Sequence, residues 1–384
     1  MKLICKFLII LLSFFPLVVL GEEKEDPIPN AKSGILIDAA TGKILYQKKA
    51  NDKLAIASMT KMVAQIIILE KIEEGKIKWD DIVTGSKNAA SMGGSQIYLA
   101  EGEKISIRDL MKGISMASGN DATVQMAEVI SGSEKKFVEL MNDKVKELGL
   151  KNTHFVNCTG LDEKNHYSSA YDLAMIARDL LINHPTILKF SSVYEDYLRE
   201  NTKNKFWLVN TNKLVRFYEG CDGLKTGHTD NAGYCLSATA KRNNYRLIGI
   251  VLGESNSKVR NKETMNLLDY GFMNTKYNVL KKAKSIVKRV ALDKAKDKEI
   301  DIHLKNNLGV VEDVNDDEHN YKFSIKLNNI KLPVKANSIV GKMNVREDNK
   351  IVASSPLIVL KDVDKLNYFE LFLNNLNGIV SGNI

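Results

Sequence analysis

The sequence predicts an α+β fold, within the broad α/β class, in which an antiparallel sheet is covered by helices and is followed by a small all-β domain. Three observations support this prediction. Apolar runs typical of strands occur near the start of the chain and again after Gly220, and helical periodicity fills the stretch between them. Strands at both ends of such a stretch pair into one sheet that the helices cover. After the charge-rich residues 281–301, period-two alternation over residues 321–327 predicts the second domain.

The N-terminal strands come from two apolar runs, residues 34–38 and 43–46, whose four-residue connection predicts a β-hairpin. Apolar residues at three- and four-residue intervals then predict a helix that begins at Ser58. Residues 91–95 read as a loop because glycine and serine dominate them. The hairpin therefore leads directly into a helix start.

The central helices follow from the same periodicity. It runs over residues 107–130 with a break at 118–120, and it returns at residues 135–148 and 169–182. Past Gly220 the period changes to that of strands. We expect strands at residues 224–227, 234–240 and 246–252, a tight turn at 242–244, and a last helix at 263–272.

Length and composition favour two domains, expected over residues 27–275 and 280–360. With 384 residues, 44% of them hydrophobic, the chain can bury a large core. The net charge of +8 is spread among mixed charges without an arginine-rich arm, so nucleic acid is not an expected partner. A mildly basic exterior suits work beside anionic polymers or lipid headgroups.

The first residues have the pattern of a secretory signal peptide, predicted over residues 1–21. Lys2 and Lys6 stand at its start, and residues 7–20 are apolar. This stretch is short for a membrane span and contains Pro16, which disfavours an uncleaved anchor. The chain is therefore expected to be exported.

Three cysteines follow the predicted signal: Cys158, Cys221 and Cys235. An odd number in an exported chain argues against a disulfide framework and favours buried thiols. A single bridge between Cys221 and Cys235 stays open as an alternative.

Ser58 and Lys61 form the first candidate motif, S-x-x-K. A serine at a helix start lies near free backbone N–H groups, which favour a developing negative charge. Lys61 lies one turn later on the same side, so its amine can reach the Ser58 oxygen. The same spacing also occurs at Ser133 and Ser285, in charged stretches that read as solvated, and an ordinary helix cap is the alternative for Ser58.

Two further motifs strengthen this hypothesis. Ser118-Gly119-Asn120 interrupts a helical run, and such a break can turn two short polar side chains into a cleft. Lys225-Thr226-Gly227 occurs once, on a predicted strand, where a cation and a hydroxyl stand beside a residue with no side chain. Either motif alone has a simple structural explanation, but the ordered combination of three does not.

This combination, S-x-x-K, S-x-N and K-T-G, resembles the penicillin-recognising serine enzymes. Gly160-Leu161-Asp162, the Tyr167-Ser168-Ser169-Ala170 string and the residues around Lys225 make the chain similar to the low-molecular-weight penicillin-binding proteins, the D-alanyl-D-alanine carboxypeptidases of peptidase family S11. The resemblance covers nearly the whole chain. It implies a β-lactamase/transpeptidase-like catalytic domain with a helical subdomain, acting on peptidoglycan stem peptides and acylated by β-lactam antibiotics.

The resemblance also implies roles for individual residues. Ser58 is the expected nucleophile, Lys61 its base and Ser118 a proton relay, while Asn120 holds the stem peptide. The oxyanion hole is expected on the backbone N–H groups of Ser58 and His228. The expected substrate-binding set is Asn120, Lys225, Thr226, Gly227, His228, Thr229 and Arg260.

Other classes of enzyme are less well supported. None of the six histidines forms an H-E-x-x-H set and no phosphate-binding glycine loop occurs, so neither metal nor cofactor is expected. A class A β-lactamase is the main rival with the same fold, but its second motif is S-D-N where this chain has S-G-N, and no E-x-x-L-N loop lies between the second and third motifs here. A penicillin-binding sensor that deacylates slowly stays open as an alternative.

The C-terminal residues 362–384 are expected to form an amphipathic membrane anchor. Between Val363 and Val380, Leu and Phe recur at three- and four-residue intervals with amides on the opposite side. Charged and amide residues interrupt the segment at every turn, so it cannot span a bilayer. The resemblance places an anchor here, so we expect the enzyme at the outer face of the cytoplasmic membrane. A terminal helix packed on the β-domain is the alternative.

Overall fold

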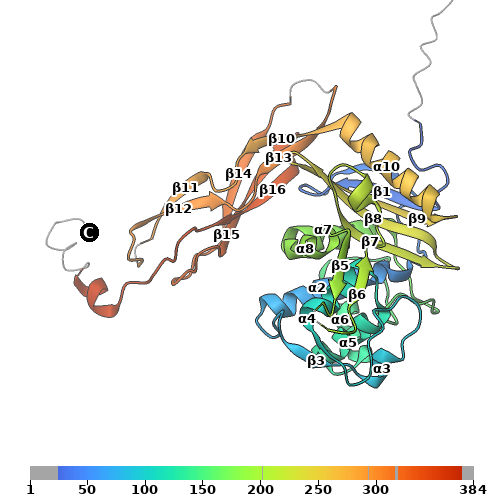
Figure 1. The fold of residues 1–384 in the computed structure, drawn as a ribbon. Coiled ribbons are helices and arrows are strands. Elements are labelled where there is room, and N and C mark those ends of the chain that lie inside the picture. Colours follow the sequence, from blue (N-terminus) through green and yellow to red (C-terminus); the bar gives the residue numbers. More distant parts are fainter. Residues whose placement is uncertain (1–24, 201, 293, 316–318, 374–384) are drawn as a thin grey trace, which may run out of the picture.

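The structure, a computed structural model, describes residues 25–200, 202–292, 294–315 and 319–373. The predicted signal peptide therefore lies outside the described residues. Figure 1 shows a body of sheet and helices from which an elongated β-domain extends. The predicted α+β architecture, with a small all-β domain after it, is confirmed.

The central sheet has five antiparallel strands in the order β2-β1-β9-β8-β7. Their bounds are β1 Ser33–Asp38, β2 Ile44–Lys48, β7 Cys221–Thr229, β8 Gly233–Arg242 and β9 Tyr245–Glu254. Ile35 of β1 pairs with Ile250 of β9, so the two ends of the domain meet in the middle of the sheet. The prediction of one sheet built from both extremities is correct.

Side chains of the central strands alternate between two apolar cores. Ile35 and Ile250 face the core on the side of the helical subdomain, whereas Leu36 and Val251 face the core that lies under helix α10. Because both faces are covered, β1 is buried along its whole length. The strand that positions the third motif, β7, stands at the free edge of this sheet.

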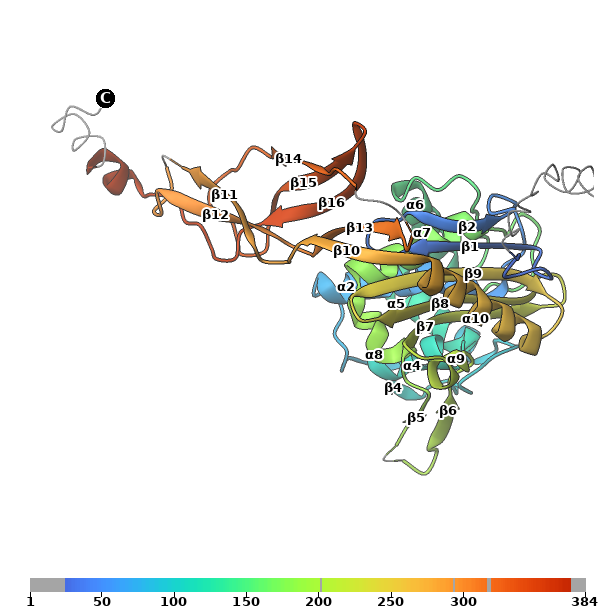
Figure 2. The same cartoon turned by 90° about the horizontal axis from the view of Figure 1, so that it is seen from above.

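Helices and short strands build the rest of the first domain (Figure 2). They are η1 Ala57–Thr60, α2 Lys61–Glu73, β3 Ile82–Thr84, α3 Lys87–Ala90, β4 Lys104–Ser106, α4 Ile107–Met116, α5 Asn120–Ser131, α6 Glu134–Glu147, α7 Ala170–Asn183, η2 Pro185–Ile187, α8 Leu188–Ser191, β5 Glu195–Leu198, β6 Phe206–Val209, α9 Leu214–Phe217 and α10 Ser257–Asn274. Figure 2 shows the β5–β6 hairpin projecting from this body.

Two helices differ from the sequence prediction. Helix α2 is buried on every side from Lys61 to Leu69, where one apolar face was expected, because it runs through the centre of the subdomain. Helix α10 begins six residues before the predicted Glu263, at Ser257. Its first turn is polar and carries no apolar period, but Asn256 caps it by accepting hydrogen bonds from the backbone of Lys258 and Val259.

The β-domain consists of a two-stranded ribbon and a five-stranded sheet of order β11-β12-β16-β15-β14. The bounds are β10 Thr275–Lys281, β11 Ile286–Ala291, β12 Glu299–Leu304, β13 Leu308–Asp313, β14 Lys322–Leu327, β15 Ile339–Glu347 and β16 Lys350–Ile358. The β10–β13 ribbon joins the domains: the Tyr277 ring stacks on Tyr245 at 6.2 Å, and Lys43 Nζ donates to the Val311 carbonyl at 2.9 Å. Val311 is part of the core beneath α10.

The C-terminal segment begins later than predicted. Val363, expected in the amphipathic tail, is buried in the β-domain and bridges Val334, and Lys365 bridges Ala295. Helical structure is described over residues 368–373, and the rest of the predicted anchor lies outside the described residues. Within the described part of the chain, no helix is long and apolar enough to cross a membrane. Residues 362–366 therefore belong to the β-domain.

The three cysteine thiols that follow the predicted signal are free and buried, so the alternative of a Cys221–Cys235 bridge is not realised. Cys235 pairs with Gly227 across the β7–β8 ladder, and Cys221 pairs with Ala240 at its other end.

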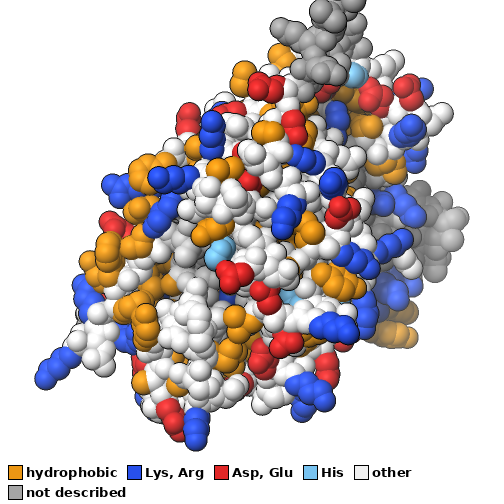
Figure 3. Space-filling view, turned by 90° about the vertical axis from the view of Figure 1, so that its right-hand side faces the viewer, with side chains coloured by type: hydrophobic (Ala, Val, Ile, Leu, Met, Phe, Trp, Pro, Cys, Tyr) orange, Lys and Arg blue, Asp and Glu red, His pale blue; other side chains and the backbone are white. Residues whose placement is uncertain are grey.

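On the face that Figure 3 shows, cations and carboxylates are interspersed, and hydrophobic side chains gather along one margin.

The buried Glu263 carboxylate of α10 binds the N-terminal segment, and a second buried carboxyl group, Glu254, lies near it. Glu263 accepts hydrogen bonds from the backbone of Asn30 and Ala31, at 3.1 and 3.2 Å. Burial, and then the neighbouring Glu263 carboxylate, raise the pKa of Glu254 to about 8. The folded protein therefore keeps a proton on Glu254 in a pH range where the unfolded chain has lost it.

We expect Glu254→Gln to flatten the pH dependence of stability. In the wild type the contribution of the protonated Glu254 is complete below pH 4.5, the usual value, and is lost as the pH rises through about 8. Glutamine is neutral at any pH, so the Tm of the variant should exceed that of the wild type at pH 9 and match it near pH 5. Thermal melts across this range test the expectation, with the exposed Glu74→Gln as control. Parallel curves for wild type and Glu254→Gln would contradict it.

Candidate active site

Ser58 lies in a tight 3₁₀ turn, η1, just before α2, and not in the first turn of the α-helix as predicted. The preceding residue, Ala57, has φ +47°, which is rare for a residue with a side chain. Thr60 Oγ1 fastens the turn by donating to the Ala57 carbonyl at 2.8 Å. The turn leaves the Ser58 side chain half-buried at the mouth of the site while Lys61 is fully buried.

Two glycines make room for this turn. A Cβ at Gly160 would lie 2.0 Å from the Ala57 carbonyl oxygen and 2.8 Å from the Ser58 nitrogen. A Cβ at Gly227 would lie 2.7 Å from the Ile56 carbonyl oxygen. The glycine of the third motif is therefore needed because β7 packs directly on the nucleophile turn.

Lys61 makes three hydrogen bonds, and no carboxylate is among the partners. Its Nζ lies 2.8 Å from Ser58 Oγ, 2.7 Å from Asn120 Oδ1 and 2.6 Å from the Thr159 carbonyl oxygen. Burial lowers the pKa of Lys61 to about 7. A neutral amine has two N–H groups and one lone pair. It can donate to Asn120 and Thr159, which only accept, and accept the hydroxyl proton of Ser58.

The second motif forms the opposite wall. Asn120 is held by three hydrogen bonds: its Oδ1 accepts from Lys61, its Nδ2 donates to the Gly93 carbonyl and its backbone N–H donates to the Ser95 carbonyl, both at 2.7 Å. Ser118 is buried in left-handed backbone with φ +62°. Its Oγ has no hydrogen-bond partner among the described residues, so it is free to bind a substrate group or relay a proton.

Strand β7 supplies the third motif. Lys225 is buried, its Nζ donates to the Thr226 carbonyl at 2.8 Å, and Thr226 Oγ1 bonds Thr211 Oγ1 at 2.8 Å. Burial, and then the charges of Lys61 and Arg260, hold the pKa of Lys225 well below its usual value. The charge of Lys61 therefore influences the pKa of Lys225, so the first and third motifs are electrostatically coupled.

The other predicted binding residues lie at different depths. The His228 side chain is exposed and its ring packs at 4.0 Å on that of Tyr234, so only its backbone faces the nucleophile turn through the neighbouring Gly227. Thr229 Oγ1 donates to Asp162 Oδ1 at 2.9 Å. Arg260 is buried on α10, and among the described residues its side chain donates only to the Asn261 side chain; burial lowers its pKa.

The sequence analysis missed two contributors to the site. The Thr159 carbonyl accepts from Lys61, and Thr211 orients Thr226. A backbone carbonyl leaves no trace in a side-chain pattern, although the neighbouring Gly160 was a usable signal. Among the residues that the structure describes, no group of His, Cys, Asp or Glu could hold a metal ion.

Comparison with known proteins gives the family. The chain matches peptidase family S11, D-alanyl-D-alanine carboxypeptidase, over residues 21–256, and the C-terminal domain of penicillin-binding protein 5 over residues 275–365. It is 45% identical over 364 residues to D-alanyl-D-alanine carboxypeptidase DacF of Bacillus subtilis, covering 94% of this chain and 93% of that protein. It is 36% identical to DacA of Escherichia coli strain K12, covering 89% and 86%.

Solved structures give the same result. Penicillin-binding protein 5 from Haemophilus influenzae has a TM-score of 0.68 at 31% identity and covers 88% of this chain and 98% of its own. Penicillin-binding protein D2 from Listeria monocytogenes, in the ampicillin-bound form, has a TM-score of 0.58 at 30% identity, with coverage of 63% and 98%. These similarities define a hydrolase of the penicillin-binding class. The chain belongs to the peptidase S11 family of D-alanyl-D-alanine carboxypeptidases.

We expect Gly160→Ala to disrupt both stability and the site, because the new methyl group would collide with the turn that carries Ser58. The loss in unfolding free energy should be about 3 kcal/mol or more. The matched control is Gly75→Ala. Gly75 also has positive φ, but nothing lies within 4 Å of the added Cβ. This substitution should therefore lower the unfolding free energy only by the strain of left-handed backbone in alanine, about 1–2 kcal/mol. Denaturant titrations measure both values, and equal losses would contradict the steric explanation.

Proposed function

We propose that this chain removes the terminal D-alanine from peptidoglycan stem pentapeptides through an acyl-enzyme on Ser58. The observation that carries the proposal is the hydrogen bond between Lys61 Nζ and Ser58 Oγ, made by a buried amine whose pKa lies near 7. Serine is a weak nucleophile unless a base takes its proton. Lys61 can act as that base at neutral pH, whereas an exposed lysine stays protonated.

In the proposed acylation step, Lys61 accepts the Ser58 proton while Oγ attacks the carbonyl between the two terminal D-alanines. The C–N bond then breaks, and the leaving amine takes a proton from the Ser118 hydroxyl, which Lys61 replenishes. The oxyanion is stabilised by the backbone N–H groups of Ser58 and His228. Preorganised donors of this kind are typically worth ~3 kcal/mol each. Water then attacks the ester and releases the shortened peptide.

Substrate binding is assigned to the two walls of the cleft. Asn120 holds the stem peptide, and the terminal carboxylate lies against Lys225, Thr226 and the backbone at Gly227. Arg260 adds positive charge from α10. Thr229 is the weakest member of this set, because its hydroxyl already donates to the Asp162 carboxylate.

β-Lactam antibiotics are proposed to acylate the same serine. The likeness to penicillin-binding protein D2 in its ampicillin-bound form supports this, as does the buried Ser118 hydroxyl, which has no hydrogen-bond partner among the described residues. A β-lactamase, or a sensor that deacylates slowly, is the alternative with the same acylation chemistry. The rate at which D-alanine is released in repeated turnovers distinguishes the carboxypeptidase, and the rate of β-lactam hydrolysis separates the two alternatives from each other.

Ser58→Ala should abolish both labelling by fluorescent penicillin and D-alanine release, because no other nucleophile replaces Oγ. The matched controls are Ser133→Ala and Ser285→Ala, which have the same S-x-x-K spacing. Ser133 only caps α6, and the half-buried Ser285 donates to the Lys282 carbonyl, so both variants should keep activity. Gel fluorescence and a D-alanine assay measure the outcome. Labelling that persists in Ser58→Ala would overturn the assignment.

The pH dependence of acylation tests Lys61. Because the base must be neutral, the acylation rate should rise with pH through a midpoint near 7, the pKa to which burial lowers Lys61. Lys61→Arg should be nearly inactive although it keeps the charge, since a guanidinium does not release its proton. Stopped-flow measurements between pH 5 and 9 give the profile; a flat profile in the wild type would point to another base.

We further propose that the enzyme is exported and lies at the outer face of the cytoplasmic membrane, where it acts in peptidoglycan biosynthesis and cell shape. The tail after the β-domain would anchor it at the membrane surface. The described start of this tail supports the proposal: Tyr368, Phe369 and Phe372 are 90%, 67% and 55% exposed, with no core of their own to fill.

Truncation after Leu366 should release an active, soluble enzyme from membranes. The cut must spare residues 362–366, because Val363 is buried in the β-domain and Asp362 pairs with Lys335 at 2.7 Å. A truncation before Asp362 should instead lower the Tm of the β-domain. Flotation with vesicles and a D-alanine assay measure the two properties. Vesicle binding that survives truncation after Leu366 would rule out the tail as the anchor.

A further inference from the structure

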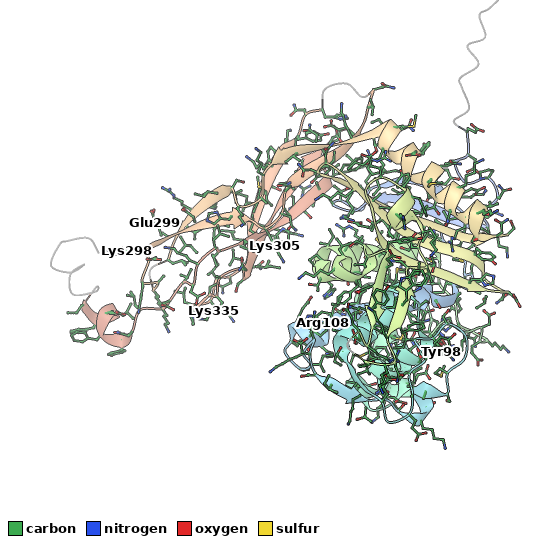
Figure 4. The ribbon with its side chains drawn as sticks, in the orientation of Figure 1. Tyr98, Arg108, Lys298, Glu299, Lys305 and Lys335 are labelled. Carbon is green, nitrogen blue, oxygen red and sulfur yellow. The ribbon has the colours of Figure 1, made fainter. Side chains whose placement is uncertain are left out.

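Tyr98 is exposed in a backbone conformation that a bulky side chain rarely adopts. Its φ is +57° and its side chain is 70% exposed, so the ring gains little from packing. Figure 4 shows it at the margin of the helical part of the first domain, away from the β-domain. Strained conformations of this kind persist only where the surrounding structure imposes them, and they cluster at ligand-binding sites.

The surrounding structure holds Tyr98 from both sides. The buried Asp121 carboxylate accepts from the backbone N–H groups of Ile97 and Leu99, each at 3.0 Å. Arg199 donates to the carbonyls of Ile97 and Tyr98 at 3.0 and 3.3 Å, and is itself paired with Glu103. The peptide groups before and after Tyr98 are thereby fixed, and the ring is directed outward.

The Asp121 and Arg199 contacts that hold Tyr98 are continuous with the candidate active site. Asp121 directly follows Asn120, which contacts Lys61, and Asn120 donates to the carbonyl of Ser95, three residues before Tyr98. Three residues span at most roughly 10 Å, so Tyr98 stands just beyond the Asn120 wall. The Phe206 ring approaches Tyr98 edge-on at 5.6 Å and leaves the rest of the ring free.

We propose that Tyr98 is a substrate-contacting residue that stacks against the amino-sugar end of the substrate. The inference rests on the proposed function, in which the stem peptide leads away from Ser58 along Asn120. Beyond a few peptide residues the substrate continues as a polysaccharide. Pyranose rings present C–H groups on their faces, and a rigid, outward-facing aromatic ring binds such a surface at small entropic cost.

The test compares three substrates: an N-acylated tripeptide ending in D-Ala-D-Ala, the free pentapeptide, and the pentapeptide attached to its amino-sugar disaccharide. Tyr98→Asn removes the ring but suits left-handed backbone, so its Tm should equal or exceed that of the wild type. Its KM for the disaccharide-linked substrate should rise about fivefold, the effect of one lost aromatic stack, with kcat nearly unchanged. Both peptides should be turned over as by the wild type.

Two further variants serve as controls. Tyr98→Phe keeps the ring and should behave as the wild type. Phe217→Ala removes a ring of similar exposure, 67%, from α9, which packs on the core beneath α10, and it should leave all three substrates unaffected. An equal change for all substrates in Tyr98→Asn, or no change for any, would overturn the proposal. If the wild type released D-alanine from none of them, the proposed function would fail instead.

Discussion

A buried amine that has neutral hydrogen-bond acceptors but no carboxylate partner is the constraint on which the site depends. Lys61 loses its hydration and receives in return only Ser58 Oγ, Asn120 Oδ1 and the Thr159 carbonyl. A carboxylate in any of these positions would keep the ammonium charged and useless as a base. The left-handed Ala57 and the glycine at 160 are the local distortions that bring these three acceptors together.

The sequence predicted the parts of the fold that depend on side-chain periodicity. The hairpin of β1 and β2, the break at Ser118 and the three consecutive strands after Gly220 all carry such a signal, and the structure has them. The three motifs also gave most of the side chains around Lys61. The features that the sequence could not predict depend on backbone groups and on polar turns. Examples are the Thr159 carbonyl and the capped first turn of α10. The helical spacing of apolar residues predicted for the tail likewise included Val363, although Val363 is a core residue of the β-domain.

The two domains are joined on the side of the sheet that faces away from the nucleophile. The β10–β13 ribbon continues from α10, and Val311 belongs to the core between α10 and the sheet. The tyrosine stack and the Lys43 hydrogen bond add directional contacts to this apolar junction. These described contacts at the domain junction therefore involve neither β7 nor η1.

The pairing of β1 with β9 has a consequence for biogenesis. A strand near the start of the chain has no partner in the central sheet except its own hairpin until residues 245–254 are available. Contacts so distant in sequence close slowly, because the loop entropy is lost before they form. A chain threaded through a membrane from its N-terminus would stay open during passage, and the cleft would assemble only after the last strand of the sheet had crossed.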